Sequence, residues 1–211
     1  MGSSPWVSKI MKKKIIVLVV FFVIAAAIGG VFYWWENIRL TPPEKWDTAK
    51  FNQSKDFIVT DTPNGKLVED KKEKIKFLLP TDWTKASEDN IGGIIFLGPD
   101  SAMAANFIVS KGCKVFAMAT EAKTDMQTLG QALRQRFSWS SIENLQFTTT
   151  TIANHKAIRN SFDETKMKYA VNAVHIPTSR AIYDIVLETT EQDKTQCETV
   201  FENALKTLVI K

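Results

Sequence analysis

The chain of 211 residues is 45% hydrophobic and 24% charged, with a formal net charge of +4 and two cysteines. Four lysines within the first 14 residues account for the whole excess of positive charge. The other 23 of the 27 basic residues lie after Trp35 and are balanced by the 23 acidic residues, all of which lie there too. This balance argues against a nucleic-acid-binding domain, and two cysteines in a chain of this length do not make a disulfide scaffold.

Residues 15–35 form an uncharged run from Ile15 to Trp35, 21 residues long. A helix of this length spans about 30 Å, the thickness of the hydrocarbon core of a bilayer. We therefore expect a transmembrane helix over residues 15–35, with the lipid bilayer as its partner. Because lysines precede the run, residues 1–14 are expected in the cytoplasm and the rest of the chain outside it, as a single-pass protein of the cell membrane.

A cleaved signal peptide is the alternative to a retained anchor. Ile15–Ile24 has the length of a signal-peptide core, and Ala25–Ala27 supplies small residues for cleavage. The apolar run continues past this site and ends in the aromatic cluster Tyr33–Trp35, where an interfacial belt is expected. These flanks favour the anchor.

Residues 36–55 contain Pro42-Pro43 and show no periodicity, so they are predicted to form a stalk before a single domain at residues 56–211. Alternation of apolar and polar residues predicts the first strands of this domain, and Asn64-Gly65 is a strong hairpin signal. The expected strands are residues 57–60, 66–69, 75–80 and 94–97, and a longer segment at 106–120 interrupted at Lys111-Gly112.

Two stretches show helical spacing. Met126, Leu129, Leu133 and Phe137 recur at steps of three and four residues after a capping pair, Thr124-Asp125. The second stretch forms an apolar stripe of Cys197, Val200, Phe201, Ala204, Leu205 and Leu208. We expect this closing helix to pack on a sheet, with Cys197 facing it.

Strands resume between the two helices at residues 145–152, 157–162, 168–176 and 181–189. Short turns at Ala153–His155 and Pro177–Arg180 join neighbouring strands as hairpins rather than as strand–helix–strand crossovers. The predicted fold class is therefore α+β, with a central antiparallel β-sheet flanked by helices and preceded by one transmembrane helix.

Over residues 57–209 the pattern resembles the PsbP-like family, named for an extrinsic subunit of photosystem II. The resemblance lies in Phe77–Trp83, Gly92-Gly93 with Phe96, the central helix, Asn144-Leu145, the turn Asn154–Ala157, the hairpin with Tyr183 and the closing helix. It implies a PsbP-like sandwich that serves as a binding or assembly module outside the cytoplasm or in the thylakoid lumen. Members in photosystem II help to retain manganese, calcium and chloride. This chain is expected to have an anchor where they have a transit peptide, and no ion ligand is carried over.

The two histidines are the first candidates for chemistry. Neither His155 nor His175 belongs to a His-Glu-x-x-His motif or to a paired-cysteine spacing. We expect His155 to be an exposed turn residue. His175 shares a predicted strand face with Tyr169, Val171 and Ala173, so we expect a partly buried structural histidine.

The remaining candidates are equally weak as sites. Cys113 has no catalytic context, Gly92-Gly93 lacks the Lys-Ser/Thr of a phosphate loop, and Asp163-Glu164 is more typical of a solvated connection than of paired catalytic carboxylates. Asn52-Gln53-Ser54 fits an N-glycosylation site. A disulfide between Cys113 and Cys197 and two separately buried thiols both remain open.

No catalytic, cofactor-binding or metal-ligating residue is therefore predicted, and no cofactor. The expected function is a membrane-anchored extracytoplasmic domain that binds a protein partner, and an enzyme is not favoured. Exposed apolar groups near the hairpin ends at 154–156 or 177–180 are the expected binding surface. The alternative is an extracytoplasmic metal-dependent or hydrolytic enzyme whose site is assembled only in the fold.

Overall fold

The computed structural model describes residues 52–72, 75–86, 92–104, 107–122, 124–137 and 141–210. The segments predicted as the cytoplasmic N-terminus (1–14) and the transmembrane helix (15–35), and most of the predicted stalk (36–55), lie outside these residues. None of the helices in the described part is both long and apolar enough to cross a bilayer.

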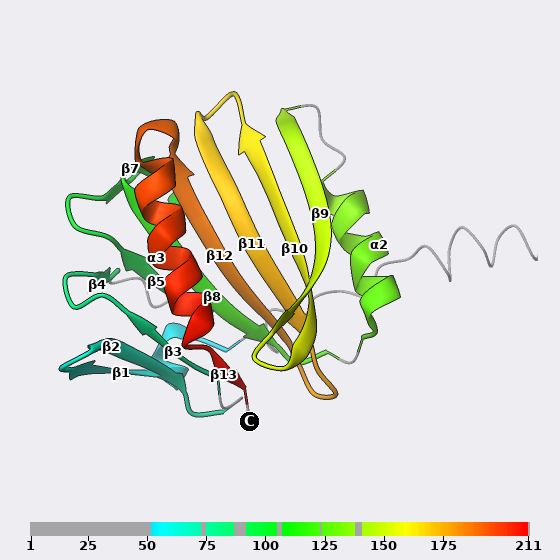
Figure 1. The fold of residues 1–211 in the computed structure, drawn as a ribbon, viewed down its shortest axis with the longest axis horizontal. Coiled ribbons are helices and arrows are strands. Elements are labelled where there is room, and N and C mark those ends of the chain that lie inside the picture. Colours follow the sequence, from blue (N-terminus) through cyan, green and yellow to red (C-terminus); the bar gives the residue numbers. More distant parts are fainter. Residues whose placement is uncertain are drawn as a thin grey trace, which may run out of the picture. The chain divides into compact units, whose positions relative to one another are not determined.

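The larger of the sheets is antiparallel throughout and has seven strands (Figure 1). In spatial order they are β4 (Thr84–Lys85), β5 (Ile94–Leu97), β8 (Cys113–Thr120), β12 (Ile182–Thr190), β11 (Tyr169–Pro177), β10 (His155–Glu164) and β9 (Ile142–Ile152). Strands β9 to β12 are neighbours in both sequence and space, as expected for strands joined by hairpins.

A smaller sheet has the order β1 (Phe57–Thr62), β2 (Gly65–Asp70), β3 (Ile75–Leu79) and β13 (Val209–Ile210). Strands β6 (Ala102–Met103) and β7 (Val109–Lys111) pair with each other. The described residues also form the helices α2 (Met126–Arg136) and α3 (Lys194–Lys206) and the single 3₁₀ turns η3 (Ser54–Asp56) and η5 (Glu191–Asp193). The described chain is therefore mostly β-sheet with few helices.

The strands and helices predicted within the domain at 56–211 are present, with ends that differ by a few residues. The segment expected at 106–120 divides at Gly112, whose φ of +74° suits glycine, into β7 and β8. The sequence prediction missed β4, β6 and β13, because strands of two residues have no periodicity to detect.

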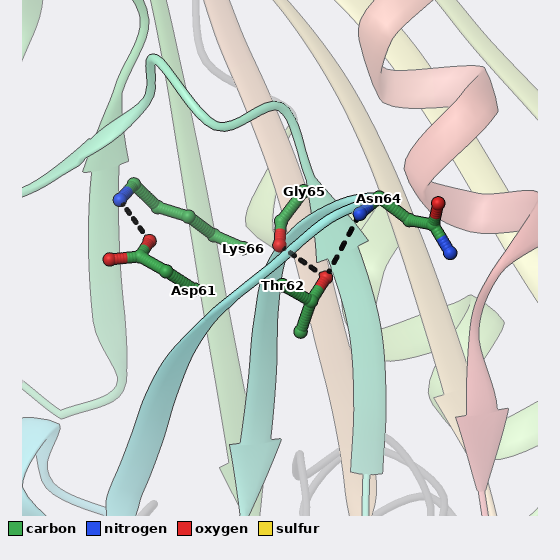
Figure 2. Close-up of polar contacts among 5 residues, drawn as sticks. All are labelled: Asp61, Thr62, Asn64, Gly65 and Lys66. Carbon is green, nitrogen blue, oxygen red and sulfur yellow. Dashed lines mark hydrogen bonds and ion pairs between the residues drawn. The ribbon is translucent and has the colours of Figure 1, made fainter.

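The predicted Asn-Gly hairpin joins β1 and β2 (Figure 2). The hydroxyl of Thr62 accepts a hydrogen bond from the backbone N–H of Asn64 and donates one to the carbonyl oxygen of Gly65, at 3.3 and 2.6 Å. Gly65 has φ +133°, and a Cβ atom there would lie 2.3 Å from the carbonyl oxygen of Leu79 on β3. Glycine is therefore required for both the turn and the close approach of β3.

Helix α2 packs on one face of the larger sheet. As predicted, Asp125 caps it, and its carboxylate accepts a hydrogen bond from the backbone N–H of Thr128 at 2.7 Å. Leu129 and Leu133 bury their side chains in one cluster with Ile158 and Ile182. The helix therefore packs on this face against β10 and the start of β12.

Helix α3 packs on the opposite face, and Figure 1 shows it in front of β12 and β8. Its buried side chains, Cys197, Phe201, Ala204 and Leu205, share one core with residues of both sheets. Cys197 forms a disulfide with Cys113 at the start of β8, with a Cα–Cα distance of 5.6 Å. The question that the sequence left open is thus resolved in favour of the disulfide.

The ordered structure includes residues that the sequence placed at the end of the stalk. Asn52 and Ser54 are buried, and the backbone N–H of Asn52 donates to the carbonyl oxygen of Ala119 on β8 at 3.1 Å. The Asn52 side chain donates to Asp70 on β2. The chain is therefore attached to both sheets before β1 begins.

Breaking the disulfide is expected to lower the free energy of unfolding by roughly 2–5 kcal/mol, because the bond closes a long loop in the unfolded chain. The two cysteines are 84 positions apart in the sequence. Denaturant unfolding with and without reductant measures the effect. The double variant Cys113→Ala/Cys197→Ala is the control, since reductant should not change its midpoint. Equal midpoints for the oxidised and reduced wild-type protein would contradict the prediction.

Candidate functional site

A polar groove lies between α3 and the β9–β11 part of the larger sheet, which we call the α3 groove. Its volume is about 490 Å³. The residues that line it are Asn144, Gln146, Thr148, Arg159, Ser161, Phe162, Asp163, Val171, Asn172, Lys194, Thr195, Glu198, Thr199 and Glu202. Only Phe162 and Val171 among these are apolar, so the groove is not an extension of the hydrophobic core.

A bulge in the β9–β10 pairing shapes one end of the groove. The register shifts between Ser161 and Asp163, and Asn144 opposite the shift has φ +54°, a conformation that asparagine tolerates better than most residues. Its side-chain amide donates to Asp163 at 2.8 Å. The ammonium group of Lys194 on α3 lies 3.2 Å from the other oxygen of the Asp163 carboxylate. Sheet and helix are thus joined across this end of the groove.

Arg159 makes a second connection from β10 to the helix. Its Nε donates to the side-chain oxygen of Asn172 on β11 at 2.9 Å, and its Nη2 pairs with Glu202 on α3. The Glu202 side chain is 42% exposed, so this ion pair is open to solvent and exchangeable. The groove therefore presents charged groups that another molecule can reach.

The charged groups of the groove stabilise one another's ionised forms. The hydrogen bond from Asn144 lowers the pKa of Asp163 below its ordinary value; partial burial opposes this shift, and the hydrogen bond and charge of Lys194 add to it. Burial disfavours the charged form of Lys194, but attraction to Asp163 and to nearby glutamates raises its pKa overall. Both groups are therefore charged at neutral pH, which suits recognition of polar or charged partner groups rather than proton transfer.

His175 lies on the opposite face of the sheet, in a buried network. Its Nδ1 is 2.6 Å from an oxygen of Asp184 on β12, and its Nε2 is 2.6 Å from the side-chain oxygen of Asn160 on β10. All three side chains are buried. The network links residues of three neighbouring strands. Because both ring nitrogens of His175 contact protein atoms, neither is left to bind a ligand.

Polar groups on this same face continue along the sheet. The Lys114 ammonium lies 2.5 Å from Glu188 and donates to the carbonyl oxygen of Phe107 at 2.6 Å. Burial, followed by the charges of Glu188 and Glu164, raises the pKa of Tyr169 to about 12. Tyr169 is therefore a neutral phenol at physiological pH.

The structure separates the other residues considered from the sequence. His155 is half-buried at the start of β10, beside the turn, and lies on the sheet face opposite to His175. Asp163 and Glu164 are consecutive strand residues, so they point to opposite faces and do not form a carboxylate pair. Within the described ranges, no group of three or more His, Cys, Asp and Glu side chains is arranged to hold a metal ion.

The backbone of Gly92-Gly93 pairs with the segment that precedes β1 and does not form a phosphate loop. Gln53 forms an isolated antiparallel bridge with Gly92, and the backbone N–H of Gly93 donates to the carbonyl oxygen of Asn52 at 2.5 Å. The Asn52 amide is buried and bonded to Asp70, so the glycosylation motif is inaccessible in the folded domain.

The hairpin ends at 153–154 and 178–181 lie at the same end of the larger sheet (Figure 1). The large apolar side chains that are exposed in the described part of the chain are Ile58, Phe107, Met167 and Val209. None of these lies at either hairpin end. The α3 groove is therefore a better-defined candidate surface than the hairpin ends.

Sequence reasoning missed the residues of the groove because they come from four separate elements. One signal was available: Arg159, Ser161 and Asp163 alternate along β10, a strand that pairs on both edges. A polar stripe on an interior strand indicates a sheet face that the core does not fully cover.

Replacing Asp184 tests the structural role of the His175 network. Asp184→Ala removes the partner of a buried ring nitrogen and is expected to lower the free energy of unfolding by about 1–3 kcal/mol. Asp184→Asn keeps an oxygen acceptor at the same position and is expected to cost less. Urea unfolding of both variants measures the difference, and equal loss in the two would contradict the prediction.

No protein-family model and no curated protein matches the sequence. Solved structures do match it. Cyanobacterial PsbP (CyanoP) from Synechocystis sp. is 14% identical, with 68% of this chain and 90% of that chain covered and a TM-score of 0.49. LpqN of Mycobacterium tuberculosis, described as involved in cell envelope biogenesis, is 11% identical, with 76% and 91% covered and a TM-score of 0.47.

A crystal structure from Bacteroides thetaiotaomicron is 15% identical to this chain, with a TM-score of 0.44. The match covers 65% of this chain, and the chain spans 45% of the length of that protein. At these identities the likeness concerns the fold alone. A PsbP structure is thus among the matches, in agreement with the resemblance to PsbP-like proteins that the sequence predicted.

Proposed function

We propose that the protein is a membrane-anchored extracytoplasmic domain that binds another protein, without catalysis, in the α3 groove. The observation that carries the proposal is the open row of charged and polar side chains between α3 and β9–β11. Arg159 and Glu202, which cross the groove, are partly exposed in their ion pair, with side-chain exposures of 30% and 42%. Partner groups can exchange with such a pair at small cost.

The composition of the groove favours a macromolecular partner over a small molecule. Small-molecule sites are predominantly apolar cavities with a few convergent polar groups. The residues that line the α3 groove are instead mostly polar, with side chains from three strands and a helix and only two apolar residues. Polar, hydrated surfaces of this kind are common at protein–protein interfaces that form and dissociate.

The location outside the cytoplasm rests on the sequence and is supported by the disulfide. Disulfides persist in oxidising compartments and are rare in the cytosol. The Cys113–Cys197 bond fits the orientation proposed from the lysines before residue 15. In this proposal residues 1–14 are cytoplasmic, residues 15–35 span the membrane, and the domain at 56–211 is outside. The stalk predicted at 36–55 ends at the buried Asn52, where the chain joins the domain.

Protease treatment tests the proposed topology. Protease added to intact spheroplasts is expected to degrade the domain and to spare an N-terminal fragment that carries residues 1–35. Lysed spheroplasts are the control for access to both sides. Protection of the whole domain would contradict the orientation, and a mature chain that begins near Ile28 would contradict the anchor.

Site-specific crosslinking tests the groove. A photoreactive amino acid at Thr199, an exposed residue that lines the groove, is expected to capture a specific protein in native membranes. The same amino acid at Gln196, which is exposed on α3 and is not among the groove residues, is the matched control. Equal capture at both positions, or none at Thr199, would count against the binding proposal. Loss of a stoichiometric metal on replacing His155 or His175 by Ala would favour the metal-dependent alternative.

A further inference from the structure

We propose that β9 is the docking edge for the partner, which adds an extended segment to the larger sheet as one more antiparallel or parallel strand. This inference rests on the proposed function and specifies how the partner binds. The larger sheet ends at β9, eleven residues long, and no described strand pairs with its outer side. A free strand edge offers a row of backbone donors and acceptors to another chain.

Beyond the bulge at Asn144, the edge at β9 lacks the features that usually prevent such pairing. From Asn144 to Ile152 the strand has no charged residue and no proline, and it contains four consecutive threonines. The opposite edge of the same sheet differs, since β4 has two residues and one of them is Lys85. Short, charged edges discourage pairing and long, uncharged ones permit it. The two edges of this sheet therefore have different capacities for pairing.

The register shows which backbone groups point outward. Ala153 and Asn154 form a two-residue turn with φ of +49° and +65°, so the flanking residues Ile152 and His155 form a hydrogen-bonded pair. Because hydrogen-bonded and non-hydrogen-bonded pairs alternate, the N–H and C=O groups of Phe147, Thr149 and Thr151 point away from β10. These are the groups that an added strand would contact.

A second hollow lies on the other side of β9, next to α2, and we call it the α2 hollow. Its volume is about 450 Å³. The described residues that line it are Met126, Gln127, Gly130, Gln131, Arg134, Phe147, Thr148, Thr149, Lys156 and Ile158. Thr148 borders both this hollow and the α3 groove. Alternate side chains of an added strand would therefore enter the two sites in turn.

The α2 hollow indicates the chemistry of the side chains that it would accept. Its charged lining residues, Arg134 and Lys156, are both basic. The Arg134 guanidinium lies over the Phe147 ring, 5.1 Å from the centroid. Met126, Phe147 and Ile158 form its apolar surface. The partner segment is thus expected to alternate, with acidic and aliphatic residues toward α2 and polar residues toward the α3 groove.

A designed peptide tests this inference with the full-length chain in detergent micelles. The probe is nine residues long and alternates threonine with valine and glutamate; the control peptide has lysine for each glutamate. The glutamate peptide is expected to slow hydrogen exchange at the amides of Phe147, Thr149 and Thr151. The lysine peptide is expected to bind about tenfold more weakly or worse, a difference of about 1.4 kcal/mol.

Proline substitution supplies the matched pair of variants. Thr149→Pro removes one outward N–H on β9 and is expected to weaken peptide binding about tenfold or more. The variant is expected to fold, because edge strands tolerate proline where the N–H faces solvent. Lys85→Pro is the control on the opposite edge, because Ala86 N–H bonds to Ile95 and Lys85 N–H therefore points outward. Circular dichroism checks that both variants fold.

The outcomes separate this inference from the proposed function. If a partner is captured at Thr199 but the glutamate peptide does not slow exchange at the three outward amides, strand addition is overturned. Groove binding then remains in place. Protection that rises with protein concentration in the absence of peptide shows β9 pairing between two copies, and it also overturns the inference. Should Thr149→Pro fail to fold, the exchange pattern of the wild-type protein decides the matter.

Discussion

The attachment of α3 to the larger sheet is the constraint on which the rest of the domain depends. One stripe of the helix is buried among residues of both sheets, and Cys197 on that stripe is bonded to Cys113 on β8. The position of the helix is thus set by packing and by a covalent bond together. The orientation of its other faces is therefore fixed as well. Lys194 and Glu202 lie opposite β10 and form ion pairs with it.

Strand β10 shows how one short sequence supplies both core and surface. Ile158 and Phe162 point toward the α2 side and are buried, whereas Arg159 and Asp163 point toward α3 and form ion pairs with it. Period-two alternation makes this division unavoidable once the pairing register is set. A slip of one residue would place the arginine among the leucines of α2, so the register and the groove are specified by the same pattern.

Much of the fold could be predicted from local patterns. Alternation and the Asn64-Gly65 turn located the first hairpin, and the three-to-four-residue spacing from Met126 to Phe137 located α2. The disulfide could not be predicted, because each cysteine lies on an apolar pattern that fits a buried thiol equally well. The groove could not be predicted either, since its ion pairs join residues 31 and 43 positions apart that meet only when α3 packs. Separations of this kind leave no local signal.

The burial of Asn52 has a mechanical consequence. Tension on the chain before Asn52 would pass through its backbone bond to Ala119 and its side-chain bond to Asp70, and so into β8 and β2. Because β8 carries Cys113, the disulfide spreads that load to α3. Three strands, β12, β11 and β10, lie between β8 and β9. Tension of this kind would therefore be borne by the centre of the fold, and the far edge of the sheet would stay unstrained.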